Sequence, residues 1–234
     1  DDQTFGTRNA VAAWRKSKPM NTDNTLTSEL DHWIFLKLPK SMKQGCTYTV
    51  CVPEGLGSDV PQSSVTFDVW TSQSEAVHVN IIGYSPKEAV KAADLYLWLG
   101  DGGQRDYSAF EGNKVYLYNV DTGAKTKVGS VKFWKEASEH PNEAGEKNLT
   151  GSDVWTVDFK YSKPGRYRLV VDGVGCSMDF YISDDVYFEP YHYSLRGYYY
   201  MRLGEPIDPA ITPVPRQPMF IPEVDPVGFT VYKT

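Results

Sequence analysis

Short stretches of alternating apolar and polar residues, separated by turn residues, recur along most of the chain. A period of two residues is typical of strands that bury one face. Before residue 75 this alternation predicts four strands, at 11–14, 32–38, 45–52 and 65–70. Residues 21–25 are expected to form a loop. Four strands make a thin sandwich, so we expect this part either to lack strands that precede Asp1 or to lean on the segment that follows.

A denser run of strands is predicted after a short polar joint at 72–75. Its members are expected at 77–84, 92–99, 115–120, 127–134, 154–159, 166–171 and 178–182. Asp121-Thr122-Gly123 predicts a hairpin turn, and Lys163-Pro164-Gly165 predicts a tight turn, because proline presets φ and glycine supplies a positive φ. About seven short strands with regular turns are typical of an immunoglobulin-like β-sandwich.

The spacing becomes helical after residue 185. One face of the predicted helix carries Phe188, Tyr191, Leu195, Tyr198 and Tyr199. The segment 183–185, Ser-Asp-Asp, is expected to cap its N-terminus, and Gly204 is expected just past its C-terminus. Beyond this point the prolines exclude both helix and central strand. They are Pro206, Pro209, Pro213, Pro215, Pro218, Pro222 and Pro226.

The predicted fold class is therefore all-β: two immunoglobulin-like β-sandwiches followed by one α-helix and an extended Pro-rich tail. The expected domains are a β-sandwich module at 1–74, with strands missing or borrowed, a second sandwich at 75–184, and the helix with its tail at 185–234.

Composition narrows the function classes. The formal net charge of -6 leaves no basic surplus for binding nucleic acid. No apolar run approaches the roughly 18–20 residues of a membrane span. The acidic, polar start at Asp1 is not a signal peptide, so the segment is a mature form, a cut piece or a cytosolic protein. Asn148-Leu149-Thr150 matches the N-glycosylation pattern.

The three cysteines form no recognisable framework. Cys46 and Cys51 are five residues apart on one predicted strand and so face opposite sides, while Cys176 lies far away in sequence. Their spacing matches no zinc motif. We expect three free or buried thiols.

Polar residues with catalytic or ligating chemistry are scattered. Asp184 and Asp185 could bind calcium, but capping the helix is the simpler role. Asp153 and Asp158 could be a carboxylate pair, but strand alternation separates them. The histidines never reach a ligand spacing such as H-x-x-x-H. They are His32, His78, His140 and His192. No catalytic residue, cofactor site or metal site is predicted in this chain.

Two other groups have both a functional and a structural interpretation. Trp98, Trp134 and Trp155 could stack on sugar rings, although core packing is the default in a sandwich. The run 198–200, Tyr-Tyr-Tyr, could line a glycan cleft or attach the helix to a neighbouring element. The glycine-rich segment 100–103 lacks the lysine and helix of a phosphate-binding loop.

Four phrases together resemble one family. The segments Val77–Pro86, Pro164–Gly175 and Asp184–Tyr187 are similar to the N-terminal immunoglobulin-like domain of family 9 glycoside hydrolases, which include cellulases. The aromatic helix Arg196–Gly204 is similar to the first helix of that family's (α/α)6 barrel. The phrases occur in the family's order and cover roughly residues 75–204. In the family this helix often ends with cysteine-glycine, where this chain has leucine-glycine.

The resemblance implies a secreted or periplasmic polysaccharide-degrading parent protein of the inverting type. The family's base lies in an aspartate-alanine-glycine-aspartate motif inside the barrel and its acid is a later glutamate; the motif is absent here. The chain is therefore expected to be a non-catalytic region that braces a catalytic barrel of the same parent chain, with β-glucan as a further candidate partner. The alternative is a stand-alone carbohydrate-binding or adhesion module, and an active hydrolase is the third.

Overall fold

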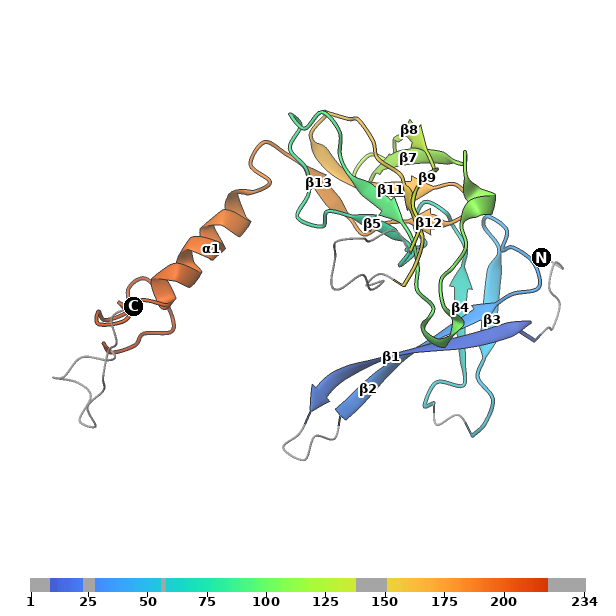
Figure 1. The fold of residues 1–234 in the computed structure, drawn as a ribbon, viewed down its shortest axis with the longest axis horizontal. Helices are drawn as coiled ribbons and strands as arrows, with labels where there is room; N and C mark the ends of the chain where they lie inside the picture. Colours follow the sequence, from blue (N-terminus) through green and yellow to red (C-terminus); the bar gives the residue numbers. More distant parts are fainter. Residues whose placement is uncertain (1–8, 23–27, 56–57, 138–150, 219–234) are drawn as a thin grey trace. The chain divides into compact units, whose positions relative to one another are not determined.

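The structure is a computed structural model that describes residues 9–22, 28–55, 58–137 and 151–218. In this part of the chain it contains antiparallel sheets and a single α-helix, as the all-β class predicts (Figure 1). The chain divides into two compact units, Asp1–Asp184 and Asp185–Thr234. The expected boundary at 74/75 stays a prediction.

The first unit begins with two separate two-stranded sheets. The first pairs β1 (Ala12–Thr22) with β2 (Ser28–Lys37), and the second pairs β3 (Thr47–Cys51) with β4 (Gln62–Thr66). Among the described residues, none before Ala76 is buried. A complete first sandwich with its own core therefore stays a prediction.

The second part of this unit has two larger sheets. One has the order β5-β6-β10-β9, formed by Val77–Val79, Ala93–Leu95, Val154–Thr156 and Lys132–Lys135. The other has the order β12-β11-β7-β8, with β13 paired to β11, formed by Gly175–Cys176, Gly165–Val171, Lys114–Asn119, Lys125–Ser130 and Phe180–Ile182. Two short 3-10 helices, η1 (Gly100–Gly102) and η2 (Ser108–Phe110), lie between β6 and β7.

Both larger sheets contribute to one hydrophobic core. Leu95 and Trp155 come from the first, and Leu117, Leu169 and Phe180 from the second. Alternation along β7 and β11 directs these side chains inward, because successive residues of a strand point to opposite faces. The core is therefore shared by the two sheets, as in a sandwich.

One predicted strand is divided between the two sheets. The prediction of a single strand at 127–134 is wrong, because β8 pairs with β7 and β9 pairs with β10. The change occurs at Val131, which is buried and whose N–H donates to Asn113 O at 2.9 Å. The residue at which the chain passes from one sheet to the other is thus part of the shared hydrophobic core.

The glycine-rich segment at η1 receives the ribbon formed by β1 and β2. Gly100 has φ +75°, and a Cβ there would lie 2.1 Å from Arg15 O, while one on Gly102 would lie 2.5 Å from the Trp14 ring. The Asp101 carboxylate accepts the Arg15 N–H at 2.7 Å. The glycines thus allow the ribbon's backbone to approach the sandwich closely.

The second unit contains α1 (Phe188–Tyr200). The expected side-chain cap from 183–185 is wrong: Tyr187 is the N-cap residue and makes no side-chain capping bond. The Asp185 carbonyl instead accepts the Phe188 N–H, and the Asp184 carboxylate pairs with Lys87 at 3.3 Å. At the other end Met201 is the C-cap, so the helix ends earlier than predicted and Gly204 is not the residue that directly follows the cap.

Part of the proline-containing segment folds back on the end of α1. Ile207 and Thr212 are buried, and the Thr212 hydroxyl lies 2.7 Å from the Tyr200 hydroxyl. Arg216 donates to the carbonyls of Tyr200 and Arg202 at 2.9 and 2.6 Å. The described part of this segment is therefore tied to the helix, and an extended tail stays a prediction for the remainder.

Candidate functional site

Within the second unit, the described residues leave the aromatic face of α1 exposed. Phe188 is 67% exposed and Tyr198 71%, and Tyr191 and Leu195 are exposed as well. No residue of α1 is buried. A stable amphipathic helix normally gains most of its stability from packing that face. This surface, Phe188, Tyr191, Leu195 and Tyr198, is called the helix face below.

The three consecutive tyrosines have different roles. Tyr198 belongs to the helix face, whereas Tyr199 and Tyr200 are half-buried. The Tyr200 hydroxyl contacts Thr212 and accepts a hydrogen bond from Arg196 at 2.7 Å, and these two bonds lower its pKa. The Tyr199 hydroxyl accepts the Asp208 N–H at 3.3 Å. Two of the three thus attach the segment after the helix.

The two aspartates considered as a carboxylate pair are engaged separately. Asp153 accepts the Ala137 N–H at 2.8 Å and the Gln104 amide at 3.1 Å. Asp158 accepts the Ala93 N–H at 2.9 Å. The carboxylate that interacts with Asp158 is Asp94 rather than Asp153. Burial, and then the negative charge of Asp158, raise the pKa of Asp94. Backbone donors hold Asp153 and Asp158 in structural roles.

Metal-ligating side chains do not gather in the described part of the chain, where no group of three or more His, Cys, Asp or Glu could hold an ion. His32 bonds the Ser17 hydroxyl at 2.8 Å. His78 stacks on Tyr96 at 3.9 Å and donates through Nε2 to its carbonyl, and burial lowers its pKa. His140 and the triplet at 148–150 lie outside the described residues. No helix in the described ranges is long and apolar enough to cross a membrane.

The three tryptophans separate into one buried and two exposed rings. Trp155 is buried against Phe133 and Tyr107, as the default role predicts. Trp98 is 45% exposed and Trp134 60% exposed. The structural interpretation therefore fails for two of the three.

The outer face of the five-stranded sheet carries a cluster of aromatic rings. Trp70 packs over Tyr116 and Tyr118, with ring centroids 5.4 and 6.1 Å away, and the Lys125 ammonium lies 4.1 Å from the Trp70 ring. These rings cover one another and form no open platform.

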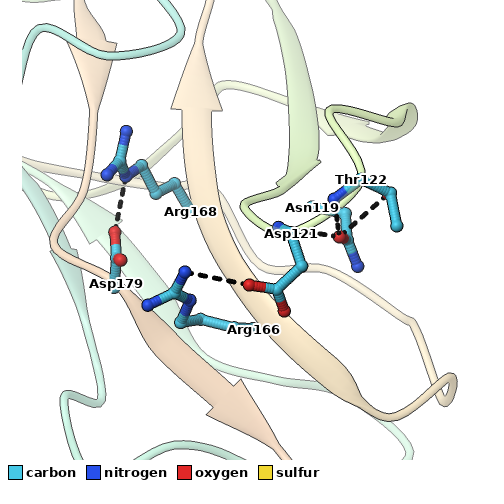
Figure 2. Close-up of polar contacts among 6 residues, drawn as sticks. All are labelled: Asn119, Asp121, Thr122, Arg166, Arg168 and Asp179. Carbon is cyan, nitrogen blue, oxygen red and sulfur yellow. Dashed lines mark hydrogen bonds and ion pairs between the residues drawn. The ribbon is translucent and has the colours of Figure 1, made fainter.

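Polar pairs fill the adjoining part of this face. Figure 2 shows Arg168 directed to Asp179 and Arg166 directed to Asp121, the latter pair at 2.9 Å. The side-chain oxygen Oδ1 of Asn119 accepts three hydrogen bonds, from the Asp121 N–H, the Thr122 N–H and the Thr122 hydroxyl, which stabilises the hairpin turn between β7 and β8 (Figure 2). The expected hairpin is confirmed, and these charges serve local structure.

None of the three cysteines forms a disulfide, as expected. At pH 8, iodoacetamide should label exposed Cys51 readily and leave Cys176 almost unlabelled. Burial raises the pKa of Cys176 to about 11, so only about one molecule in a thousand carries the reactive thiolate at pH 8. Mass spectrometry of the digested protein measures both sites, and denaturant should make them equal. Equal labelling in the native protein would contradict the described burial.

Comparisons with known proteins find likeness among solved structures. A scan against models of protein families finds no match, and a search of curated proteins finds no match either. Among solved structures, the chain is similar to a metagenome-derived glycoside hydrolase family 9 endoglucanase, at 25% sequence identity and a TM-score of 0.42. The likeness covers 60% of this chain and 23% of that one. The chain thus spans less than a quarter of that enzyme's length.

Proposed function

We propose that this chain is the non-catalytic N-terminal region of a longer, family 9-like glycoside hydrolase, in which the sandwich at 75–184 braces a catalytic barrel and α1 is the barrel's first helix. The observation that carries the proposal is the uncovered helix face. Its aromatic side chains lie at helical spacing and stay exposed among the described residues of the second unit. A further helical layer of the same polypeptide is the occupant that the sequence resemblance implies.

The approach to α1 supports a bracing role. The Tyr84 N–H donates to Tyr181 O at 2.9 Å, and the Ser183 N–H donates back to Tyr84 O at 3.1 Å. Phe180 and Ile182 are buried in the core on the same strand. The backbone is therefore hydrogen-bonded into the sandwich up to Ser183, one residue before the end of the first unit.

The engagement of the acids supports a role without catalysis. Inverting hydrolysis needs a carboxylic acid and a carboxylate across a gap that holds a water molecule. Asp153 and Asp158 are instead occupied by backbone N–H donors. The catalytic carboxyls would lie in the barrel, and a secreted or periplasmic location and a polysaccharide substrate belong to the same proposal.

The test compares three proteins: residues 1–234 alone, the longer polypeptide encoded by the gene, and that polypeptide without residues 1–184. We expect hydrolysis of a soluble β-glucan by the longer polypeptide and none by residues 1–234. Removal of 1–184 should lower the thermal midpoint of the remaining protein. Turnover by residues 1–234, or a downstream protein equally stable without them, would contradict the proposal.

A second candidate function, a stand-alone carbohydrate-binding module, is favoured by one observation. Trp134 on β9 and Trp98, three residues after the end of β6, are both exposed, although large aromatic side chains normally fill the core of a sandwich. It requires no barrel, so glycan binding by residues 1–234 with no activity in any longer product would support it over the first.

A further inference from the structure

One edge of β2 is open in the described part of the chain, where β1 and β2 pair only with each other (Figure 1). An open strand edge presents N–H and C=O groups to any other strand, and natural proteins usually keep such edges short, bulged or covered. β2 is instead ten residues long. The register shift of the ribbon, between Pro19 and Asn21, lies in β1. β2 therefore offers a long, regular edge to which a further strand can pair.

The outer edge of β1, in contrast, is covered by η1. The Arg15 N–H donates to the Asp101 carboxylate at 2.7 Å, and a Cβ on Gly100 would lie 2.1 Å from Arg15 O. Both backbone groups of Arg15 therefore point away from β2. Residues opposite each other in an antiparallel pair exchange either both hydrogen bonds or neither. The N–H and C=O of Ile34, which lies opposite Arg15, therefore point away from β1 as well.

The same alternation continues along β2. Pro19 has no N–H to donate, and it lies opposite Leu30, where β1 needs no donor toward β2. Every second residue of β2 thus directs its backbone groups to the open edge: Leu30, His32, Ile34 and Leu36. The side chains of this set include three exposed aliphatic groups, because Leu30, Ile34 and Leu36 are 49%, 58% and 41% exposed.

The charges of β2 match those of a second β2 in the opposite direction. When two antiparallel copies are centred on Trp33, Glu29 of each copy lies opposite Lys37 of the other. Within the ribbon, Glu29 and Lys37 both lie opposite neutral residues of β1. Opposite charges that face each other across a strand pair are favourable. Pairing between two copies therefore gives both side chains the cross-strand partner that β1 does not provide.

Neighbouring registers are less favourable. Centred one residue later, the pairing places Lys37 opposite Asp31, which already lies opposite Lys18 of β1, and Glu29 falls outside the paired segment. Centred one residue earlier, it places Glu29 opposite Phe35, so a charge faces an aromatic ring. The register centred on Trp33 pairs every residue from Glu29 to Lys37.

We propose that β2 pairs with β2 of a second copy of this chain and forms a symmetric dimer around a four-stranded sheet, β1-β2-β2-β1. Leu30 then lies beside Leu36 of the second copy, so two aliphatic pairs add to the two charge pairs. The interface is isologous and uses the open edge of both copies, and assembly therefore stops at two. It does not involve the helix face and does not rest on the proposed function.

The test is sedimentation equilibrium of residues 1–234 over a series of concentrations at low ionic strength. We expect the molar mass to rise from 26.4 kDa toward twice that value. Glu29→Lys and Lys37→Glu should each weaken dimerisation roughly tenfold, because by symmetry each creates two like-charge pairs. The double variant E29K/K37E should dimerise as the original protein does. Glu29 and Lys37 are roughly 27 Å apart on one extended strand, so such a rescue can arise only between two copies.

Leu195→Lys, on the helix face, is the control variant and should dimerise as the original protein does. A molar mass of 26.4 kDa at every concentration would overturn the proposal. So would a double variant that dimerises no better than the single ones, which would trace their loss to a damaged ribbon. Loss of the dimer in the Leu195 control alone would place the interface on the helix face and overturn it as well.

Discussion

Replacing Gly100 with alanine is expected to release the ribbon of β1 and β2 from the sandwich. The new Cβ would lie 2.1 Å from Arg15 O and 2.7 Å from the Lys16 Cα. Both are backbone atoms, so no side chain can rotate away. The positive φ adds strain, and together these terms should cost about 3 kcal/mol of docking free energy. Hydrogen exchange of the β1 and β2 amides, followed by mass spectrometry, measures the release.

Gly103→Ala is the matched control for this experiment. Gly103 also has a positive φ, +69°, but a Cβ there would meet nothing within 4 Å. Its ψ of -150° lies in a region that only glycine populates readily, so the substitution should cost about 1–3 kcal/mol of backbone strain, with the ribbon still protected from exchange. Equal exchange in both variants would show that backbone strain alone, and not the close approach of Arg15, determines the effect.

Replacing Phe180 with alanine should destabilise the sandwich by about 3–5 kcal/mol. Phe180 is fully buried and contacts the rings of Tyr84 and Phe159 at centroid distances of 5.3 and 5.9 Å. Its loss leaves a cavity beneath β13, the strand that precedes α1. Urea unfolding at neutral pH measures the change in the free energy of unfolding.

The adjacent residue provides the control. Tyr181 lies on the same strand but points outward, and Tyr181→Ala should change stability by no more than about 0.5 kcal/mol. A comparable loss in both variants would mean that β13 does not alternate between core and solvent as described. Because the stability of a single domain is only about 5–15 kcal/mol, Phe180→Ala should leave a marginal protein.

Strand patterns were most informative where one face is buried in the core. Around Leu117 and Leu169, strict alternation predicts both the strand and its inward residues, and the structure has both. In the ribbon of β1 and β2, alternation predicted a strand that is too short. The short strand predicted at 11–14 runs from Ala12 to Thr22, because hydrogen bonding to β2 extends it without any buried face to mark the sequence.

Features that depend on distant partners could not be predicted. The sequence around Gly100 and Gly102 predicts only a loop. Glycine is required at these positions because Trp14 and Arg15, more than eighty residues earlier in the chain, pack against them. Asp184 has the chemistry of a helix cap but pairs with Lys87. The sheet change at Val131 has one local signal, the three-residue spacing from Val128 to Val131 that breaks the period of two, but nothing in the sequence shows that the two halves pair with different strands. In each case tertiary contact overrides local preference.

Among the tryptophans considered as ligand-stacking residues, the sequence identified the candidates, but only the fold showed which are buried and which are exposed. Trp98, Trp134 and Trp155 look alike in sequence, yet one is core and two face outward. The bulge that exposes Trp134 depends on its pairing with β10. The helix face, in contrast, follows from spacing alone, because i, i+3, i+7 and i+10 share one side of any α-helix.

The measurement that tests the central claim most directly is hydrogen exchange of the α1 amides in two proteins, residues 1–234 and the longer polypeptide that continues beyond Thr234. If a barrel covers the helix face, these amides should exchange rapidly in residues 1–234 and become protected in the longer protein, while protection of β11 stays the same in both. Equal protection of α1 in the two proteins would contradict the account.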